Sequence, residues 1–396
     1  MRLRGVEVLV VGGGVAGLAA AAALAKAGAS VRLLEQAGGF HEVGAGVQIS
    51  PNGARVIAAL GQGEALARKA RRSRAVVLRS GARGGEVLRM ALPESGPGFH
   101  LVHRADLISV LEGALDGVEV RFHATVESVS FEGARPSVAL RGGARLSADL
   151  ILGADGLHSK LRPVVLGAAP AAPFFTGQVA WRALIPAEAG AAPEAQVFMG
   201  PGRHLVSYPL RGGSLRNLVA VEERGDWARE GWNHRDDPVH LRAAFKGFGG
   251  AVPGWLEQVG ELWLWGLFRH EVAARWYRRG VAILGDAAHP TLPFMAQGAN
   301  LALEDAFALV RALEHAPGLE AGLGAWQATR RPRVQRVVQA ANRNARNYHL
   351  RAPLAPLAHL GLRLSSRLVP DAPLRRFGWI YDHDVTAPIS RSRDPG

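Results

Sequence analysis

The sequence contains no cysteine among its 396 residues. This absence excludes disulfide bonds, thiolate metal sites and a dithiol redox centre, and it fits a reducing cytoplasm. Apolar runs of about 18 residues or more, which would predict a membrane span, are also missing. The N-terminal MRLRGVEVLVVGGG does not predict a signal peptide, because Glu7 and three glycines interrupt its apolar run. We therefore expect a soluble, cytoplasmic protein without stable membrane association and without a metal site.

Acidic residues are scarcer than basic ones, and the net charge is +13. Such an excess is compatible with a nucleic-acid or membrane partner, with steering of an anionic substrate, or with a bias towards arginine in the genome. The basic residues are scattered, and their two clusters, ARKARRSR (67–74) and TRRPRVQR (329–336), contain no interleaved aromatic residues. We therefore expect a basic surface but no nucleic-acid partner.

The order of apolar patterns predicts two kinds of sheet. Val6–Val11 is a short buried strand, an alanine-rich helix follows, and Ser30–Leu34 completes a βαβ unit. From about Phe174 to Val272, long alternating strands predict an antiparallel sheet. A short apolar strand returns at Val281–Leu284, and the chain from Gln297 onwards is mostly helical in pattern. No internal repeat is visible.

These patterns predict an α/β protein. A Rossmann-like nucleotide-binding domain is interrupted by a mostly antiparallel sheet domain, and a helical C-terminal region follows. The predicted boundaries are 1–72, 100–173 and 275–345 for the nucleotide-binding domain, 73–99 and 174–274 for the sheet domain, and 346–396 for the C-terminal segment.

Gly12, Gly14 and Gly17 form a GxGxxG motif after a strand and at the start of a helix. The glycines permit a tight turn, close approach of a pyrophosphate and close packing of the helix on the strand. Glu35 ends the next strand and is placed to accept hydrogen bonds from an adenosine ribose. The motif predicts dinucleotide binding, and on its own it does not distinguish NAD from FAD.

Two further stretches distinguish them. ILGADGLHSKLR (151–162) and ILGDAAHPTLP (283–293) each place an aspartate after a strand. Together with the glycine motif they resemble the three motifs of the class A FAD-dependent monooxygenases, the single-component aromatic hydroxylases. The resemblance covers nearly the whole chain. Within the family, the strands GQVAWRALIP and GRHLVSYPLRGGSLRNLVAVEE and the segment AHPTLPFMAQGANLALEDA look most like salicylate hydroxylase and 3-hydroxybenzoate 6-hydroxylase.

The resemblance implies a non-covalent FAD site. In the family, the residue matching Asp286 holds the ribityl hydroxyls, the residue matching Asp155 lies near the pyrophosphate, and the residue matching Arg104 contacts FAD. The segment 297–300 would point helix N–H groups at the flavin. The full set of cofactor residues that the resemblance assigns is Gly12, Gly14, Val15, Ala16, Gly17, Glu35, Gln48, Arg104, Val126, Asp155, Asp286, Pro293, Gly298, Ala299 and Asn300. Asp155 and Asp286 could alternatively be turn-forming residues.

The resemblance also implies the catalytic residues. His204 and Tyr208 are four residues apart on one strand, so their side chains lie on the same face. His204 would take the proton of a phenol, and Tyr208 and Gln297 would orient the substrate. His204 could alternatively be a surface residue, and Arg182 could either anchor a carboxylate or pair with an acid. For His158 and His289, which lie inside the cofactor motifs, we prefer a structural role.

We therefore predict an FAD-dependent monooxygenase that hydroxylates a small hydroxyaromatic acid through a flavin C4a-hydroperoxide. NADH or NADPH and O2 would be co-substrates, and a homodimer is compatible with this function. No second nucleotide fold is visible, and Gly44–Gly53 resembles the mobile-flavin segment of the family. Gln48 replaces a histidine of nicotinate-hydroxylating relatives, which disfavours a pyridine substrate. The alternatives are a larger alicyclic or polyketide-like substrate and a non-catalytic binding module of the same fold. The absence of cysteine excludes a flavin disulfide reductase.

Overall fold

The first half of the fold is a six-stranded sheet in the order β19-β20-β12-β1-β2-β8. The structure is a computed structural model that describes residues 1–40, 46–167, 172–225, 234–368 and 372–388. The strands of this sheet are β1 (Glu7–Val11), β2 (Ser30–Leu34), β8 (Glu119–Arg121), β12 (Leu150–Gly153), β19 (Tyr277–Arg278) and β20 (Val281–Ile283). All neighbours run parallel except β19 and β20. The central strands are short and apolar because both faces of the sheet are buried.

Helices and two small sheets surround this core. Helix α1 (Val15–Lys26) presents mostly alanine to its neighbours, so α8 (Gly298–His315) can pack closely against it. The other helices here are α2 (Pro51–Ala59), α3 (Gly63–Lys69), α4 (Arg104–Glu112) and α5 (Leu161–Leu166). The small antiparallel sheets contain β9 (Val126–Ser130), β10 (Ser137–Leu140) and β11 (Arg145–Ser147), and β3 (Gly46–Ile49), β4 (Arg71–Arg72) and β7 (His100–His103). The sequence does not predict β3, β4 or β7, which are short and pair with partners distant along the chain.

The second half is an eight-stranded sheet in the order β17-β18-β13-β16-β15-β14-β5-β6. Its strands are β5 (Ala75–Ser80), β6 (Glu86–Ala91), β13 (Phe174–Pro186), β14 (Glu194–Gly200), β15 (Arg203–Leu210), β16 (Leu215–Glu223), β17 (His234–Arg235) and β18 (Trp263–Arg269). Every neighbouring pair is antiparallel except β14 with β5. The predicted fold class, with a mostly antiparallel sheet interrupting the nucleotide-binding half, is confirmed.

The two faces of the large sheet have different neighbours. Helices α6 (Pro238–Ala244) and α7 (Val252–Glu257) pack on one face, where Trp181 and Phe198 are buried between strands and helices. The sequence pattern does not predict these two helices. Because side chains alternate along a strand, Arg182 points to the opposite face from Trp181. That opposite face lies towards the nucleotide-binding half.

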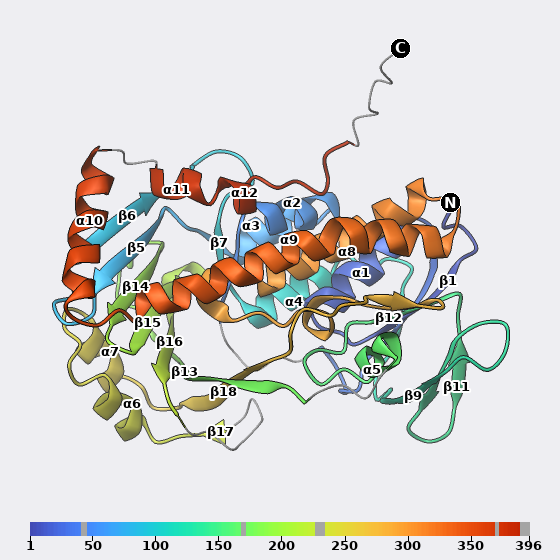
Figure 1. Cartoon of the computed structure of the whole chain (residues 1–396), viewed down its shortest axis with the longest axis horizontal. Coiled ribbons are helices and arrows are strands. Elements are labelled where there is room, and N and C mark those ends of the chain that lie inside the picture. Colours follow the sequence, from blue (N-terminus) through green and yellow to red (C-terminus); the bar gives the residue numbers. More distant parts are fainter. Residues whose placement is uncertain (41–45, 168–171, 226–233, 369–371, 389–396) are drawn as a thin grey trace, which may run out of the picture.

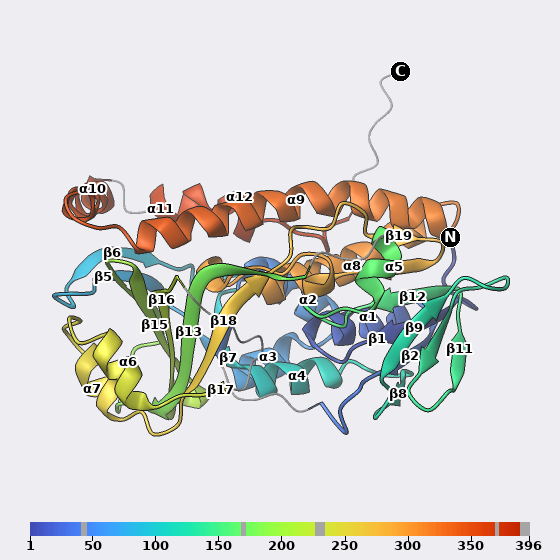
Figure 2. The same cartoon turned by 60° about the horizontal axis from the view of Figure 1, so that its bottom comes forward.

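A long C-terminal helix connects the two halves. Helix α9 (Leu319–Tyr348) runs across the molecule from the nucleotide-binding sheet to the large sheet (Figures 1 and 2). Three shorter helices follow it: α10 (Leu354–Leu368), α11 (Ala372–Arg376) and α12 (Gly378–Tyr381). Among the described residues, no helix combines the length and the apolar character that a membrane crossing requires. The C-terminal end of α9 therefore brings residues near position 349 onto the large sheet.

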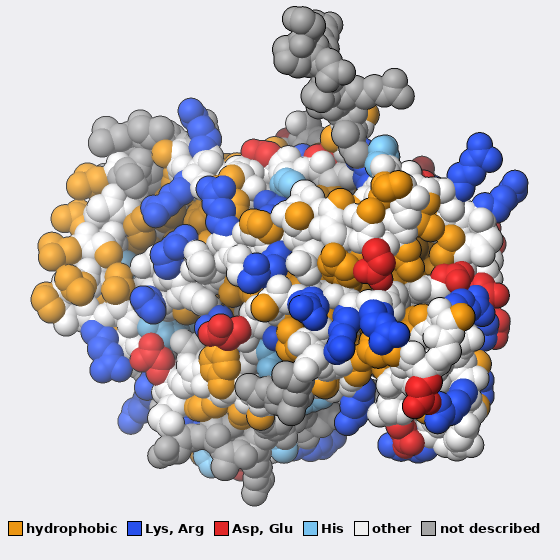
Figure 3. Space-filling view, turned by 45° about the vertical axis from the view of Figure 1, so that its right-hand side comes forward, with side chains coloured by type: hydrophobic (Ala, Val, Ile, Leu, Met, Phe, Trp, Pro, Cys, Tyr) orange, Lys and Arg blue, Asp and Glu red, His pale blue; other side chains and the backbone are white. Residues whose placement is uncertain are grey.

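The face of the molecule drawn in Figure 3 carries dispersed basic side chains. On the face drawn in Figure 3, Lys and Arg side chains are spread among neutral and apolar ones, and acidic side chains are fewer. This distribution agrees with the expected scattered basic surface.

Candidate active site

The turn between β1 and α1 leaves room for a phosphate group. Gly12 has a φ of +103°, and a Cβ there would lie 2.5 Å from the Ala154 carbonyl oxygen. A Cβ on Gly17 would lie 1.8 Å from the Gly12 carbonyl oxygen, so only glycine permits the helix to approach the strand this closely. At Gly14, the N-cap of α1, no atom lies within 4 Å of the Cβ position. The first turn of α1 contains no acidic residue, so its N–H groups present a positive end to this space.

Glu35 lies beside the same turn. Its carboxylate oxygens accept hydrogen bonds from the backbone N–H groups of Gly13 (2.6 Å) and Ala37 (2.7 Å). These contacts fix the carboxylate where the sequence predicts a ribose. Val126, at the start of β9, is buried in the apolar core of this half.

An elongated cavity extends from the glycine turn to the large sheet. It brings together most of the predicted residues, namely Gly14, Val15, Ala16, Gln48, Arg104, His204, Tyr208, Asp286, Pro293, Gly298 and Ala299. Gly12, Gly17, Glu35, Val126, Asp155, Gln297 and Asn300 are not part of its lining. Gly46 and Val47 of β3 also line the cavity, whereas Gly44 and Ala45 of the predicted mobile segment lie outside the described residues.

Asp286 and Arg104 line the cofactor side of the cavity, and Asp155 lies outside the lining, between the lining residues Ala154 and Gly156. Asp286, in the turn η2 (Gly285–Ala287), exposes its side chain to the cavity, and the low-polarity surroundings raise its pKa although His289 and Arg104 oppose this. Burial lowers the pKa of Arg104, whereas Asp286 raises it. Asp155 uses Oδ2 to accept a hydrogen bond from the Lys160 N–H group at 2.7 Å. Its Oδ1 is buried without a hydrogen-bond partner among the described residues. Asp155 therefore shapes its turn, as the alternative reading of this residue predicts.

The N-terminus of α8 points into the cavity. Gly298 and Ala299 line the cavity, and the first turn of the helix contains no acidic residue. The preceding turn η3 (Pro293–Met295) places Pro293 in the lining, and Ala296 follows with a φ of +52°. The positive end of this helix can therefore stabilise negative charge on a ligand.

Gln297 is placed differently from the prediction. Its side chain is buried and does not line the cavity. Its Nε2 donates to Ser50 Oγ at 3.0 Å, and its Oε1 accepts from Asn52 Nδ2 at 3.1 Å. The side chain therefore turns towards α2, where both of its polar ends have partners, and the expected role in orienting the substrate is wrong for this geometry. The Asn300 side chain also lies outside the cavity lining and binds the backbone. Its Oδ1 accepts a hydrogen bond from the Ser50 N–H group at 3.0 Å.

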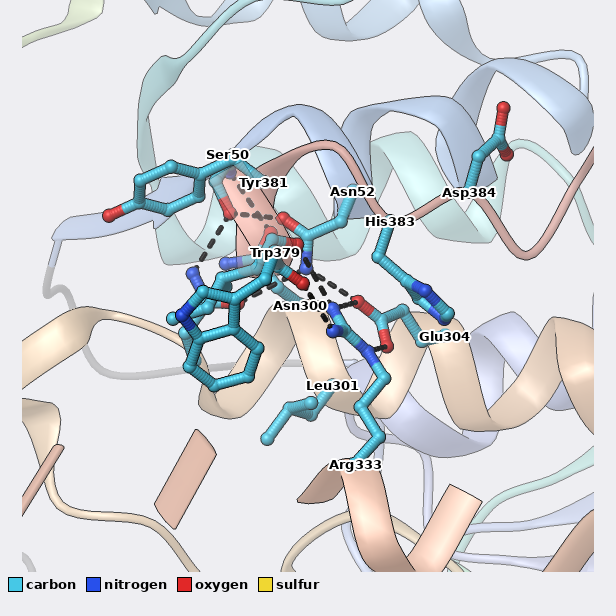
Figure 4. A network of polar contacts seen from close by, with 12 residues as sticks. Ser50, Asn52, Asn300, Leu301, Glu304, Arg333, Trp379, Tyr381, His383 and Asp384 are labelled. Carbon is cyan, nitrogen blue, oxygen red and sulfur yellow. Dashed lines mark hydrogen bonds and ion pairs between the residues drawn. The ribbon is translucent and has the colours of Figure 1, made fainter. Parts of the chain in front are cut away.

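Behind α8 lies a buried ionic network, which we call the α8 network and define as Asn52, His289, Glu304, Asp305, Arg330 and Arg333. Glu304 pairs with Arg330 at 2.6 Å and with Arg333 at 2.7 Å, and it accepts a hydrogen bond from Asn52 Nδ2 at 2.6 Å. Arg333 also donates to the Trp379 carbonyl oxygen and so holds the C-terminal segment (Figure 4). Burial opposes the charge of Glu304, but Arg330, Arg333 and Asn52 together lower its pKa to about 2. His289 pairs with Asp305, which fits the structural role preferred for it.

The large sheet forms the far wall of the cavity. His204 and Tyr208 on β15 both face the cavity, as their spacing predicts, and Val206 lies between them on the same face of the strand. His204 is 1% exposed, which excludes the alternative of a surface residue. Burial lowers the pKa of His204 well below its ordinary value, with a further contribution from His349, and burial raises the pKa of Tyr208. Both side chains are therefore uncharged at neutral pH, and His204 is free to accept a proton.

Arg182 of β13 adds a positive charge to this wall. Its guanidinium lies 4.1 Å from the centre of the Trp265 ring, and its Nε has no hydrogen-bond partner among the described residues. Burial and the neighbouring Arg104 lower the pKa of Arg182 to about 10, so it is protonated at neutral pH. None of the ion pairs between described residues includes Arg182. Of the two roles that the sequence leaves open, the structure therefore favours an anchor for an anion.

His349 is a site residue that the sequence does not predict. This residue follows α9, and its Nε2 lies 2.7 Å from Nδ1 of His204. No motif surrounds it, and the pairing spans 145 residues of sequence. Only the length and direction of α9 bring the two rings together.

Comparisons with known proteins agree with this architecture. The family model described as FAD binding domain matches residues 5–341. The chain is 35% identical to a 3-amino-4-hydroxybenzoate 2-monooxygenase from Streptomyces cremeus, over 88% of this chain and 89% of the relative. It is 32% identical to a salicylate hydroxylase from Pseudomonas putida, over 98% of this chain and 95% of the relative. Among solved structures, HpxO of Klebsiella pneumoniae complexed with FAD and uric acid is 26% identical, with a TM-score of 0.82 over 93% of this chain and 96% of that chain.

Proposed function

The chain belongs to the FAD-binding-domain family and is an FAD-dependent monooxygenase, and from this premise we propose that it hydroxylates a small hydroxyaromatic acid of the salicylate or hydroxybenzoate type. Reduced nicotinamide, NADH or NADPH, and O2 are the co-substrates in this proposal. The observation that supports it most is the cavity itself, which joins the dinucleotide turn to a wall carrying an uncharged histidine, a tyrosine and a buried arginine without an acidic partner.

The described residues fit FAD. Gly14 leaves open space at the N-terminus of α1, where the pyrophosphate would be held, and Glu35 lies where the adenosine ribose would be held. Asp286 faces the cavity and would accept hydrogen bonds from the ribityl hydroxyls. The N-terminus of α8 would stabilise negative charge on the ring. When bound, FAD supplies hydride acceptance from the nicotinamide and activation of O2.

The far wall supplies the contacts for the substrate. Arg182 would hold a carboxylate, because its guanidinium lines the cavity, forms no ion pair among the described residues and matches a carboxylate in charge and geometry. His204 would accept the proton of the phenol, which makes the ring more electron-rich and more reactive towards an electrophilic oxygen. Tyr208 would donate a hydrogen bond that orients the substrate. Val219, Val221 and Trp265 are apolar neighbours in the same lining and would exclude water from the site.

Close packing connects the loop over the cofactor site to the substrate wall. The Gly46 N–H group donates to Asn217 Oδ1 at 2.8 Å, and a Cβ on Gly46 would lie 2.4 Å from the Tyr208 ring. A substrate that moves Tyr208 would therefore also move β3. This contact supports the proposal that substrate binding stimulates oxidation of the reduced nicotinamide.

A substrate panel tests the proposed function. The purified, FAD-loaded protein is given NADH or NADPH with salicylate, 3-hydroxybenzoate, 4-hydroxybenzoate or 3-amino-4-hydroxybenzoate, and with the corresponding amides as controls. We expect at least one acid to accelerate nicotinamide oxidation and to be recovered as hydroxylated product, with little hydrogen peroxide. Equal oxidation rates with and without every acid would contradict the proposal and favour a larger alicyclic or polyketide-like substrate. A protein that binds no FAD would instead support the non-catalytic binding module.

We propose a cytoplasmic enzyme, and a homodimer stays a prediction that sedimentation of the FAD-loaded protein tests. The proposed division into domains is tested by limited proteolysis, which should cut first near the crossings at residues 73, 100, 174 and 275.

A further inference from the structure

A chain of three polar side chains leads from the cavity to the surface. His204 Nδ1 lies 2.7 Å from His349 Nε2, and His349 Nδ1 lies 2.9 Å from Glu223 Oε1. His204 is 1% exposed and His349 is 5% exposed, whereas the Glu223 side chain is 42% exposed. The three residues come from β15, from the end of α9 and from the end of β16. His349 lies beyond residues 5–341, so the match to the family model does not imply this contact.

The carboxylate end of the chain fixes which ring nitrogens carry hydrogen. An ionised Glu223 only accepts hydrogen bonds, so His349 Nδ1 must be the donor. A neutral His349 then offers Nε2 as an acceptor, and His204 Nδ1 must donate to it. In this arrangement His204 Nε2 carries no hydrogen. It is therefore the ring nitrogen that can accept a proton from a substrate hydroxyl.

We propose that His349 and Glu223 form a proton relay that holds His204 in the base-competent tautomer and carries the phenol proton from the cavity to solvent. Nε2 of His204 takes the phenol proton while His204 Nδ1–H passes its proton to His349 Nε2. His349 Nδ1–H passes its proton to Glu223, which releases it to water. Each transfer breaks one N–H or O–H bond and forms another, so the phenolate is the only new charge left in the cavity and no oxidant or reductant is involved. The inference rests on the proposed function, because the phenol is the source of the proton.

The surroundings of the relay favour transfer over storage of the proton. The rings of Phe294 and Tyr348 lie 5.4 Å and 5.3 Å from the His204 ring, so little water can stabilise an imidazolium there. Burial lowers the pKa of His349, although Glu223 opposes this, and Arg203 lowers it further. A proton reaching either ring is therefore driven towards the exposed carboxylate.

Among the described residues, three arginines and a second glutamate lie near the outer end of the relay. Arg351 lies 3.5 Å from Glu223 Oε2. Arg203 pairs with Glu222 at 3.3 Å, and Arg224 pairs with Glu222 at 3.1 Å. Arg351 therefore places a positive charge beside the acceptor end of the relay. Glu222 has its own partners and takes no part in the chain.

The first arm of the test measures the tautomers and needs no turnover. Histidine side chains of the FAD-loaded enzyme are labelled with nitrogen-15, and wild type is compared with Glu223→Gln and with the control Glu222→Gln. We expect Nδ1–H forms of both His204 and His349 in wild type and in Glu222→Gln, and a mixture of forms in Glu223→Gln, whose amide can donate as well as accept. An unchanged Nδ1–H form of His204 in Glu223→Gln would overturn the proposal.

The second arm measures whether the relay moves a proton. His349→Gln should retain FAD and substrate-stimulated nicotinamide oxidation, but hydroxylation at pH 7 should fall by about tenfold or more, with the loss recovered as hydrogen peroxide. A ring-fluorinated substrate has a more acidic phenol and depends less on the relay. With this substrate, the decrease in hydroxylation caused by His349→Gln should therefore be several-fold smaller. Equal losses for both substrates would show a merely structural role and overturn the relay. If wild type hydroxylates no hydroxyaromatic acid, the proposed function fails, and the tautomer arm alone decides whether the chain of three exists.

Discussion

Two buried polar regions lie on either side of the N-terminal part of α8, and they differ in how their charges are compensated. In the α8 network, Glu304 and Asp305 are each paired with arginine or histidine at hydrogen-bond distance. In the cavity, Arg182 has a buried Nε without a partner among the described residues, and Asp286 faces the cavity, where desolvation raises its pKa. Buried charges that the protein compensates itself hold the fold together, whereas buried charges left for a ligand lower stability until that ligand binds.

The largest effect, on the free energy of unfolding, is expected from removing a carboxylate of the α8 network. Glu304→Ala leaves Arg330 and Arg333 with too few acids in a buried site, and it should lower the free energy of unfolding by about 3–5 kcal/mol. Glu64 pairs with Arg68 on the surface, so Glu64→Ala should change the free energy of unfolding by only about 0.5 kcal/mol or less. Urea denaturation of both variants without FAD measures this difference. A loss at Glu304 no greater than the loss at Glu64 would remove the distinction between the two regions.

The next effect concerns catalysis in the cavity. His204→Ala should leave FAD binding and nicotinamide oxidation nearly intact, but it should cut hydroxylation by ~10²-fold or more, because a positioned base is lost. The lost product should reappear as hydrogen peroxide. Tyr208→Phe keeps the base, so it should mainly weaken substrate binding. If Tyr208→Phe loses hydroxylation while His204→Ala does not, the two roles are exchanged.

Asp286→Ala should separate cofactor binding from stability. The variant removes a charge-assisted hydrogen bond to the ribityl chain, which corresponds to ~1.5–3 kcal/mol, so FAD affinity should fall by about tenfold or more. The free energy of unfolding without FAD should stay within about 0.5 kcal/mol of that of wild type, because the Asp286 side chain is exposed to the open cavity when no cofactor is bound. Fluorescence titration with FAD and urea denaturation give the two numbers. Unchanged FAD affinity would mean that Asp286 only shapes its turn.

The smallest effect is expected at Arg182. Arg182→Gln should weaken binding of the hydroxyaromatic acid by roughly tenfold and leave binding of the corresponding amide unchanged, since only the acid carries the charge. Stability without ligands should not fall. Arg182→Lys is the matched variant, because it retains the charge but loses the planar pair of donors. Equal weakening for acid and amide would show that Arg182 does not contact the carboxylate.

Local patterns predicted the parts of the site that short segments build by themselves. The glycine turn and the position of Asp286 each depend on one strand and the turn after it, so the sequence was sufficient to place them. Gln297 was placed in the correct turn with the wrong partners, because its side chain orientation depends on Ser50 and Asn52, about 245 residues earlier. His349 could not be found at all, since a solitary histidine after a helix has no pattern, and its contact with His204 depends on the full length of α9.

The difference between local patterns and contacts across the chain also explains which parts of the fold were predictable. Apolar alternation predicted the long strands of the large sheet, because burial of one face dominates their stability. The α8 network was not predicted, because its charges are separated along the chain and their pairing arises only in the folded state. Helices α6 and α7 were missed for a similar reason, since each is short and is stabilised by packing against the sheet.

Whether the uncompensated charge in the cavity binds the substrate is tested most directly by a crystal structure. The enzyme is crystallised with FAD and a hydroxyaromatic acid that it hydroxylates, and two distances are measured. We expect the substrate carboxylate within about 3 Å of the Arg182 guanidinium and the phenol oxygen within about 3 Å of His204 Nε2. The α8 network should be unchanged, because its charges are already paired. A carboxylate held elsewhere, with Arg182 still lacking a partner, would contradict the claim that the uncompensated charge in the cavity is there for the substrate.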